Sequence, residues 1–204
     1  MSYRTFASIA IFTFFLVEST NAQLVRFRLE ATDMEGNAIS SVNVGEDFLL
    51  NSYAKDLRTE AQCAQDCGVF AGYLDVTFDS QLASVGGSVT YSDDYQNGPS
   101  ADFTTPGLMD DIGAFSTSVN PIGLDERHLF AVPMKAMSLG SLSLESGPAN
   151  SPPQHHVLLF GIDTPINDIE FGAANVQIVP EPKSSLLLLL GLVFVVSRKR
   201  PRLG

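Results

Sequence analysis

The sequence contains no tryptophan and only two cysteines, and its basic residues are outnumbered, with 12 Lys and Arg against 23 Asp and Glu in 204 residues. Between Gln23 and Ile178 the imbalance is stronger, with six Lys or Arg, 21 Asp or Glu and a net charge of −15. Because nucleic-acid phosphates attract Lys and Arg, this segment argues against DNA or RNA as a partner. Such a charge suits a soluble domain outside the cell, and it could also recruit divalent cations.

The chain also lacks an apolar run of the roughly 20 residues that a stable membrane span needs. A shorter run, Phe6–Val17, follows Arg4 near the start, and small residues lead up to Ala22. A charged start, a short apolar middle and a small-residue exit are typical of a secretory signal peptide. We therefore predict a signal peptide over residues 1–22, cleaved by signal peptidase between Ala22 and Gln23. An uncleaved interfacial helix is the alternative.

The other end of the chain, residues 179–204, has three parts in a fixed order. A short motif comes first, an apolar stretch over Leu186–Val196 follows, and a basic end closes the chain. Basic residues after an apolar segment favour the cytoplasmic side of a membrane, so this order predicts a hydrophobic helix with a stop-transfer end. The motif is Val179, Pro180, Glu181 and Pro182, and the basic end is Arg198, Lys199, Arg200 and Arg202.

This tail resembles the PEP-CTERM sorting signal of bacteria, with Pro180, Glu181 and Pro182 matching its named motif. The resemblance implies that an exosortase processes the chain near the motif. It further implies an intermediate in the inner membrane and then the cell envelope, the surface or the extracellular matrix as the destination. An ordinary C-terminal anchor that is never processed is the alternative.

The segment between the ends, residues 23–178, has the size of one domain with a core of its own. Its apolar residues alternate with polar ones in short runs that Gly, Pro, Asn and Asp separate, which predicts an all-β, antiparallel two-sheet sandwich. The stretch 93–120 is long for a loop, so we predict that it includes a turn or short helix near Gly107–Gly113, and we predict an exposed loop over 146–153. The expected strands are Val25–Glu30, Asp47–Ala54, Val69–Phe78, Ser88–Tyr91, His128–Val132, Gly140–Leu144, His155–Phe160 and Ala174–Val179.

Two stretches of this segment are similar to cohesin modules. Val42–Phe48 resembles the pattern V-x-V-G-[DE]-x-F of an early cohesin strand, and Gly68–Asp79 resembles the central strand, which ends in an aromatic–Asp pair. The resemblance implies a sandwich of the cohesin or carbohydrate-binding-module type. Cohesins bind dockerins through one sheet face, and the sequence assigns no residue of this chain to such a face.

The two cysteines, Cys63 and Cys67, are separated by three residues. Exported chains meet an oxidising compartment, so we predict a disulfide that clips a local loop. A zinc pair would need two further ligands, and a redox motif would have C-x-x-C spacing.

Neither H-E-x-x-H nor G-x-S-x-G occurs, and the histidines do not have metal-site spacing. His155 and His156 are neighbours, so on a strand they would point to opposite faces, and His128 stands alone. We predict that all three are structural or surface residues and that no metal is bound through them.

Three acidic pairs and a group of aromatic residues remain as candidates for a binding or catalytic site. Two carboxylates in a cleft, about 5–10 Å apart, would suit a polysaccharide hydrolase, and several loop oxygens would suit calcium. Exposed aromatic rings would suit a sugar, although we expect these rings to pack on the core. The pairs are Asp93–Asp94, Asp110–Asp111 and Asp125–Glu126, and the aromatic residues are Tyr91, Tyr95 and Phe103.

The sequence thus favours a non-enzymatic surface protein that acts in adhesion or scaffolding. Its partner would be an exopolysaccharide or another surface protein. The alternatives are a calcium-dependent or carbohydrate-binding module and, with less support, a secreted polysaccharide hydrolase. No catalytic residue is assigned, and no cofactor other than calcium is considered.

Overall fold

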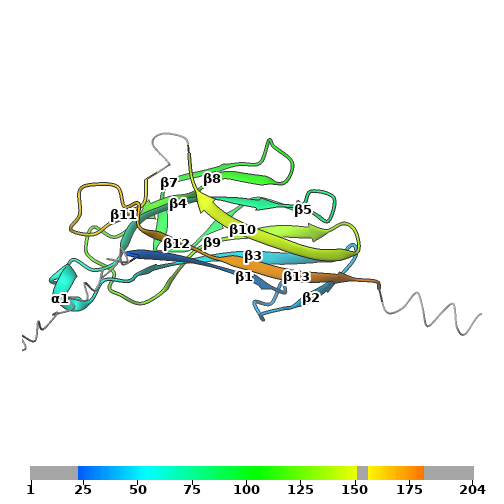
Figure 1. Cartoon of the computed structure of the whole chain (residues 1–204), viewed down its shortest axis with the longest axis horizontal. Helices are drawn as coiled ribbons and strands as arrows, with labels where there is room; N and C mark the ends of the chain where they lie inside the picture. Colours follow the sequence, from blue (N-terminus) through cyan, green and yellow to red (C-terminus); the bar gives the residue numbers. More distant parts are fainter. Residues whose placement is uncertain (1–22, 151–155, 182–204) are drawn as a thin grey trace, which may run out of the picture.

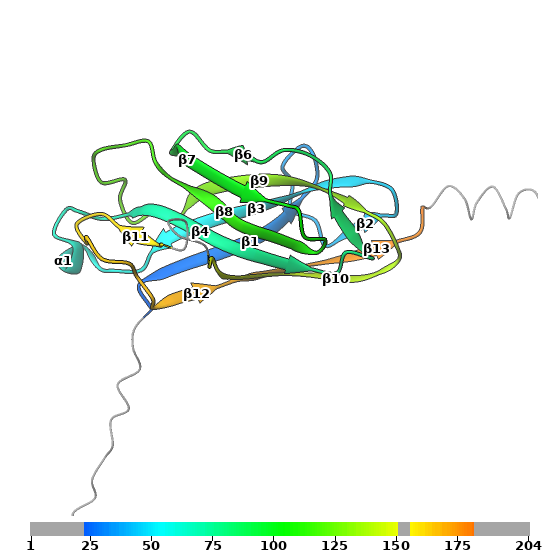
Figure 2. The ribbon, with the colours of Figure 1, turned by 90° about the horizontal axis from the view of Figure 1, so that it is seen from above.

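The computed structural model of the chain describes residues 23–150 and 156–181, which form two β-sheets packed face to face (Figures 1 and 2). The predicted signal peptide and the apolar stretch Leu186–Val196 lie outside these residues. Within residues 23–150 and 156–181, none of the helical structure is long and apolar enough to cross a membrane.

The first sheet has six strands, ordered β12–β1–β3–β9–β5, with β6 also paired to β9. Its two central pairings are long and antiparallel, β1 with β3 and β3 with β9. The strands are β1 (Val25–Thr32), β3 (Asp47–Asp56), β5 (Ala83–Val85), β6 (Thr90–Tyr91), β9 (Arg127–Ala136) and β12 (Ile169–Phe171).

The second sheet has seven strands, ordered β2–β13–β10–β4–β8–β7, with β11 also paired to β4. The pairings are antiparallel except at β2, which runs parallel to β13; in the first sheet, β12 likewise runs parallel to β1. The strands are β2 (Ser41–Asn43), β4 (Val69–Phe78), β7 (Tyr95–Asp102), β8 (Leu108–Ser116), β10 (Gly140–Pro148), β11 (Leu158–Leu159) and β13 (Ala173–Val179).

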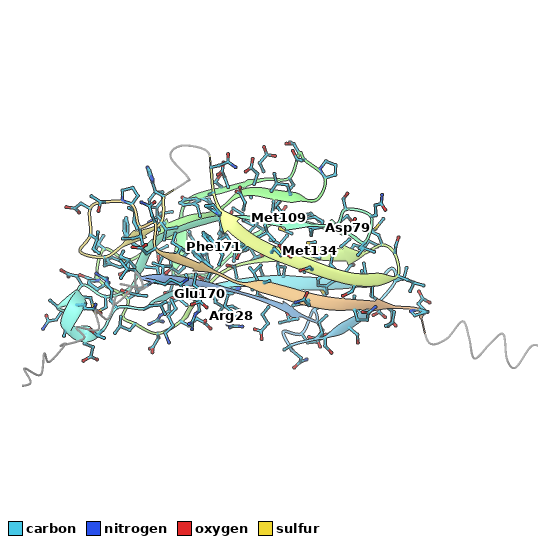
Figure 3. The ribbon with its side chains drawn as sticks, in the orientation of Figure 1. Arg28, Asp79, Met109, Met134, Glu170 and Phe171 are labelled. Atoms are coloured by element: carbon cyan, nitrogen blue, oxygen red, sulfur yellow. A yellow bond between two sulfur atoms is a disulfide. The ribbon has the colours of Figure 1, made fainter. Side chains whose placement is uncertain are left out.

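The core fills the space between the sheets because each strand turns alternate side chains inward. On β1, Val25 and Phe27 are fully buried while Arg26 faces solvent. Met109 on β8 and Met134 on β9, labelled in Figure 3, are likewise fully buried in the same apolar cluster. The predicted two-sheet sandwich is therefore confirmed, with two parallel pairings where only antiparallel ones were expected.

The largest error of the sequence-based prediction is the segment 93–120. It forms the hairpin β7–β8, whose two strands were not predicted. The turn expected near Gly107–Gly113 is present directly before β8, where the N–H of Leu108 donates a 3.1 Å hydrogen bond to the carbonyl of Thr105. Strand β7 is exposed and polar, and it contains Gly98 and Pro99, so it lacks the apolar alternation that marks a strand. The predicted loop over 146–153 is also partly wrong, because β10 continues to Pro148 and Ala149 is buried; residues 151–153 are outside the described part.

The connection from β3 to β4 holds the short helix α1 (Glu60–Cys63) and a disulfide between Cys63 and Cys67. Beside it, Asp56 and Arg58 form a buried ion pair with a 2.8 Å contact. The Arg58 side chain also donates to the carbonyls of Asp66 and Phe160, at 2.8 and 3.0 Å. One guanidinium thus ties three segments of chain together at this end of the sandwich.

Candidate functional site

The strands of one sheet carry charges of both signs, whereas the strands of the other carry acidic residues only. Among the described residues, five of the six Lys and Arg side chains lie on β1, β3 and β9 of the six-stranded sheet, and the sixth, Arg58, lies just after β3. The strands of the seven-stranded sheet carry no Lys or Arg at all. Their charged residues are Asp75, Asp102, Asp110, Asp111 and Glu145.

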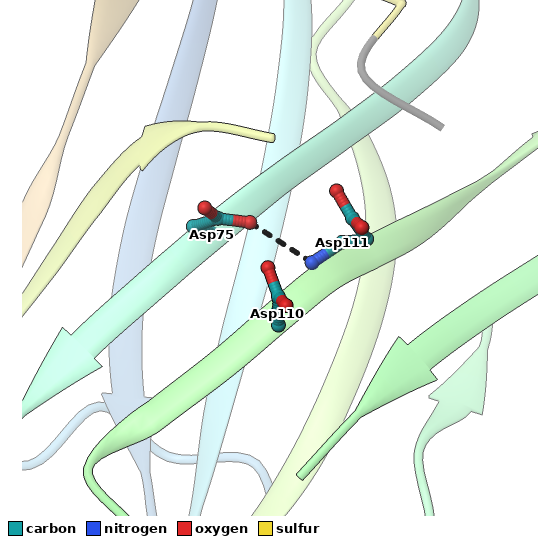
Figure 4. A group of neighbouring side chains, drawn as sticks. All are labelled: Asp75, Asp110 and Asp111. Atoms are coloured by element: carbon teal, nitrogen blue, oxygen red, sulfur yellow. Dashed lines mark hydrogen bonds between the residues drawn. The ribbon is translucent and has the colours of Figure 1, made fainter. Parts of the chain in front are cut away.

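Three of these acids meet where β4 pairs with β8 (Figure 4). The strand register places Leu74 opposite Ile112 and Val76 opposite Met109, so Asp75 faces both Asp110 and Asp111. This is a β-bulge, in which two residues of one strand oppose one of the other. One carboxylate oxygen from each aspartate lies within 4.8 Å of the others.

The bulge explains how neighbouring residues of one strand reach the same cluster. In a regular strand, Asp110 and Asp111 would point to opposite faces of the sheet. Asp111 instead has a φ of 49°, in the left-handed region, which costs roughly 1–2 kcal/mol for a residue other than glycine. Its amide donates a 2.9 Å hydrogen bond to Asp75, which helps to hold this backbone conformation.

Asn150, just beyond β10, donates hydrogen bonds to all three aspartates of the cluster. Its backbone N–H donates to Asp111 at 3.0 Å, and its side-chain amide donates to Asp75 at 3.0 Å. A longer contact of 3.5 Å joins the same amide to Asp110. The end of β10 is therefore positioned over the bulge by the carboxylates themselves.

Chemically, this cluster is the place where the described residues could hold a divalent cation. Three carboxylates supply hard oxygen ligands of the kind that calcium prefers, and water would have to complete the six to eight ligands. Three N–H groups already donate hydrogen bonds to these carboxylates, namely the backbone N–H groups of Asp111 and Asn150 and the side-chain amide of Asn150. Partial burial and the charges of Asp75 and Asp111 raise the pKa of Asp110 above its usual range.

Replacing Asp110→Asn is expected to raise the melting temperature at neutral pH slightly, on the order of 1–2 °C. The raised pKa means that the ionised form of Asp110 disfavours the fold, and that this penalty disappears as the pH falls through the folded-state pKa. The gap between variant and wild type should therefore close in acid, which melting curves across pH can follow. A gap that widens in acid would contradict this account of the cluster.

The other two acidic pairs are engaged elsewhere and do not converge. Asp94 lies 3.6 Å from Arg127, and Glu126 forms a 2.8 Å ion pair with Arg28. Asp110 and Asp111 meet Asp75 where two neighbouring strands pair, and Asp111 is itself buried, whereas a glycosidase needs two carboxylates that flank a cleft. Within residues 23–150 and 156–181, the three acidic pairs therefore do not form the geometry that the hydrolase alternative requires.

On the outer side of the six-stranded sheet, Arg28 and Tyr53 form a mixed cluster with a histidine. The guanidinium lies 4.0 Å from the centroid of the Tyr53 ring, and its hydrogen bonds to Glu126, with further support from Glu30, raise the pKa of Arg28. His128 Nε2 lies 3.1 Å from Asn51 Oδ1, and burial lowers the pKa of this histidine. His128 is thus a structural residue, as predicted; His155 lies outside the described residues.

The three aromatic residues weighed as a sugar platform have different positions. Tyr95 is fully buried and donates a 2.9 Å hydrogen bond to the carbonyl of Val69, so the prediction of core packing is confirmed for it. Tyr91 and Phe103 are only half-buried, although they pack against the core. Both line a shallow depression in the surface of the domain.

The residues of the predicted processing sites lie at the ends of the described part. Gln23 precedes β1, and Val179 ends β13, where its carbonyl accepts a 3.0 Å hydrogen bond from Val44. Pro180 and Glu181 follow directly and are exposed. Ala22, Pro182 and the four basic residues of the tail lie outside the described residues.

No family model matches the sequence, and no curated protein matches it. Solved structures do match. A cohesin module from a family 33 glycoside hydrolase of Clostridium perfringens is 16% identical, with a TM-score of 0.57 over 78% of this chain and 100% of the module. CaCohA2 from Clostridium acetobutylicum, solved in complex with CaDoc0917, is 15% identical, with a TM-score of 0.52 over 76% of this chain and 99% of the match. At these identities the likeness concerns the fold, and this chain has a cohesin-like β-sandwich.

Proposed function

We propose that this chain is an exported, non-enzymatic surface protein that works in adhesion or scaffolding by binding a partner protein. The binding surface is the outer face of the seven-stranded sheet, here called the acidic face and defined by its accessible acids Asp75, Asp110 and Glu145. The observation that carries the proposal is the charge of this sheet, whose strands bear acids and no base. A surface of one sign selects and steers a partner of the opposite sign, so the partner presents Lys and Arg.

The likeness to cohesin modules supports protein contact as the kind of work done. One of the similar structures, CaCohA2, was solved in a complex with another protein. The acidic face also borders an apolar group in which half-buried Phe70, Phe115 and Leu158 pack over Tyr73 and its neighbours. Aromatic anchors next to charged groups are the composition that protein interfaces favour.

Reversing two charges of the acidic face tests this assignment. With Asp75→Lys and Asp110→Lys combined, we expect the capture of partner proteins from the envelope and matrix fractions to fall by at least about tenfold, because like charges then meet across the interface. Wild-type capture should also weaken as salt is raised. Quantitative mass spectrometry of the captured proteins gives both results.

The matched control changes the net charge by the same amount at exposed positions outside the acidic face. Glu35→Lys combined with Asp163→Lys meets this condition, because both residues are exposed and lie outside the strands. If capture falls equally in both double variants, the change in net charge explains the loss. The acidic face would then not be the binding surface.

The destination of the protein is the second part of the proposal. Signal peptidase would remove residues 1–22, and an exosortase would cut near Val179–Pro182 after the body has crossed the inner membrane. The exposure of Pro180 and Glu181 directly after the last strand supports access by a protease. Exopolysaccharide or another surface protein would then surround the released domain.

Intact mass spectrometry of protein from the envelope and matrix fractions tests the processing. We expect surface material to start at Gln23 and to end near the motif. A glutamine in place of Glu181 would leave the fold unchanged and should slow the second cut if the motif is recognised. Full-length tails retained in the inner membrane would instead identify the tail as a plain anchor, and the matrix role would then be withdrawn.

A further inference from the structure

A cleft of about 520 Å³ opens where the edge of the six-stranded sheet meets the turn between β7 and β8. Strand β5 and the glycines Gly86 and Gly87 line one side, and Phe103 with the turn that leads to β8 lines the other. Its volume lies within the range of small-ligand sites, about 300–1,000 Å³. The cleft is separate from the acidic face, because Asp75, Asp110 and Glu145 do not line it.

The cleft carries no charge, although it belongs to a strongly acidic domain. None of its lining residues is Asp, Glu, Lys, Arg or His. Its polar groups are the hydroxyls of Ser84 and Thr105, among others, and its apolar groups include the half-buried rings of Phe78 and Phe103. An ion would gain no counter-charge here, so the lining favours an uncharged occupant.

The cleft continues into a second depression of about 330 Å³, which shares Gly87 and Phe103 with it. Between the two sheet edges at this second depression, the Tyr91 hydroxyl donates a 2.6 Å hydrogen bond to the carbonyl of Ser100. The two adjoining depressions are here called the groove. Two depressions that share a wall suit a ligand made of several linked units.

Two glycines line the groove, and they differ in how much room a side chain would have. A Cβ at Gly86 would lie 3.5 Å from the carbonyl oxygen of Pro133, which is an ordinary contact, whereas a Cβ at Gly87 would lie 3.3 Å from the Pro133 ring, which is crowded; neither residue has a left-handed φ. Gly107, at the same cleft, is different, because it has a φ of +83° and a Cβ there would lie 2.7 Å from the carbonyl oxygen of Phe78. Gly86, which packing does not demand, therefore leaves a stretch of backbone that another molecule can approach closely.

The sheet edges around the groove do not suit an added peptide strand. Such a strand needs regularly spaced N–H and C=O groups along an edge. Strands β5 and β6 have only three and two residues and are interrupted by 86–89, while β7 contains Pro99 and three register shifts. The peptide alternative therefore lacks its main source of affinity.

The geometry points to a binding site for a neutral oligosaccharide chain in this groove. The rings of Phe78 and Phe103 would contact the apolar faces of sugar rings. The hydroxyls of Ser84 and Thr105, with the backbone at Gly86 and Gly87, would pair with the sugar hydroxyls. This function is additional to the proposed protein contact and uses other residues.

Calorimetric titration of the full chain tests the assignment, in a detergent whose headgroup is not a sugar. The probes are linear neutral pentasaccharides of glucose, xylose and mannose, with an anionic pentasaccharide of galacturonate and an uncharged alanine–serine pentapeptide as competitors. We expect at least one neutral pentasaccharide to bind and neither competitor to do so. Phe103→Ala should weaken that binding about tenfold, because a stacking ring is lost.

Gly87→Val should weaken binding, because both depressions share Gly87 and a side chain there makes its backbone less accessible. Its matched control is Gly147→Val, since Gly147 has an ordinary φ and open space around it but lies on β10, away from the groove. Three results would overturn the proposal, namely no binding of any neutral probe at millimolar concentration, binding that survives both Gly87→Val and Phe103→Ala, or equal binding of the anionic sugar or the peptide. The Asp75→Lys and Asp110→Lys double variant should bind sugar normally, so failure of this site and failure of the acidic face are distinguishable.

Discussion

Removing one carboxylate, in Asp56→Ala, is expected to lower the free energy of unfolding by about 3–5 kcal/mol. Asp56 is 2% exposed and Arg58 is 8% exposed, and three hydrogen bonds join the two side chains. Without Asp56, a buried guanidinium has no counter-charge, and the Gly68 amide loses its 2.8 Å acceptor. Urea unfolding followed by circular dichroism measures the loss, since no tryptophan is present to report on unfolding.

The matched control is an ion pair of similar length on the surface. Arg26 and Glu170 are 2.7 Å apart, but their side chains are 43% and 39% exposed. Glu170→Ala should therefore cost no more than about 1 kcal/mol. Adding Arg58→Met to Asp56→Ala should recover part of the larger loss, because the unpaired buried charge is gone. Equal losses in Asp56→Ala and Glu170→Ala would refute the role given to burial.

The contribution of Asp56 also has a predicted pH dependence. Burial on its own would raise the pKa of Asp56, but the hydrogen bonds from Arg58 and Gly68, together with the Arg58 charge, outweigh it and lower the pKa. A lowered carboxyl pKa stabilises the fold above the unfolded-state pKa, and this stabilisation is lost as the pH falls through the folded-state value. The difference between wild type and Asp56→Ala should thus be constant near neutrality and shrink below about pH 4.

The second large effect is expected from a single added methyl group, in Gly113→Ala. A Cβ at Gly113 would collide with the carbonyl oxygen of Gly72 and lie 2.7 Å from the Cα of Tyr73. Both are backbone atoms of the neighbouring strand β4, so no side chain can rotate away. We expect β4 and β8 to separate locally, with a loss of about 3 kcal/mol or more in the free energy of unfolding.

Gly147→Ala provides the comparison within the same sheet. Nothing lies within 4 Å of a Cβ at that position, and its φ is ordinary, so the change should be neutral or stabilise by about 0.4–1 kcal/mol. Because Gly113 is two residues from Asp111, hydrogen exchange at the bulge should rise in Gly113→Ala and stay unchanged in Gly147→Ala. Similar stabilities for the two variants would mean that β4 and β8 can accommodate a side chain at position 113.

The sequence by itself determined the class of fold, because strand periodicity is a local property of the chain. Val69–Phe78 was predicted with its observed ends, since apolar residues alternate along it and Asp79–Ser80 follows. The cohesin-like sandwich was likewise visible in short patterns around Val42–Phe48 and Gly68–Asp79. Strand β7 was missed because an exposed edge strand buries too little to leave an alternating pattern.

Only the tertiary structure decided which residues act together. Asp75 and Asp110 are 35 positions apart, and they meet because β4 pairs with β8 in a register that contains a bulge. Likewise, Gly87 and Phe103 share a groove because two sheet edges converge. Strand pairing is a non-local choice that depends on how the whole core packs, whereas the periodicity that predicts a strand depends only on its own residues. The sequence therefore specified a sandwich of two β-sheets, and the pairing and packing of the strands determined where the acidic face and the groove form.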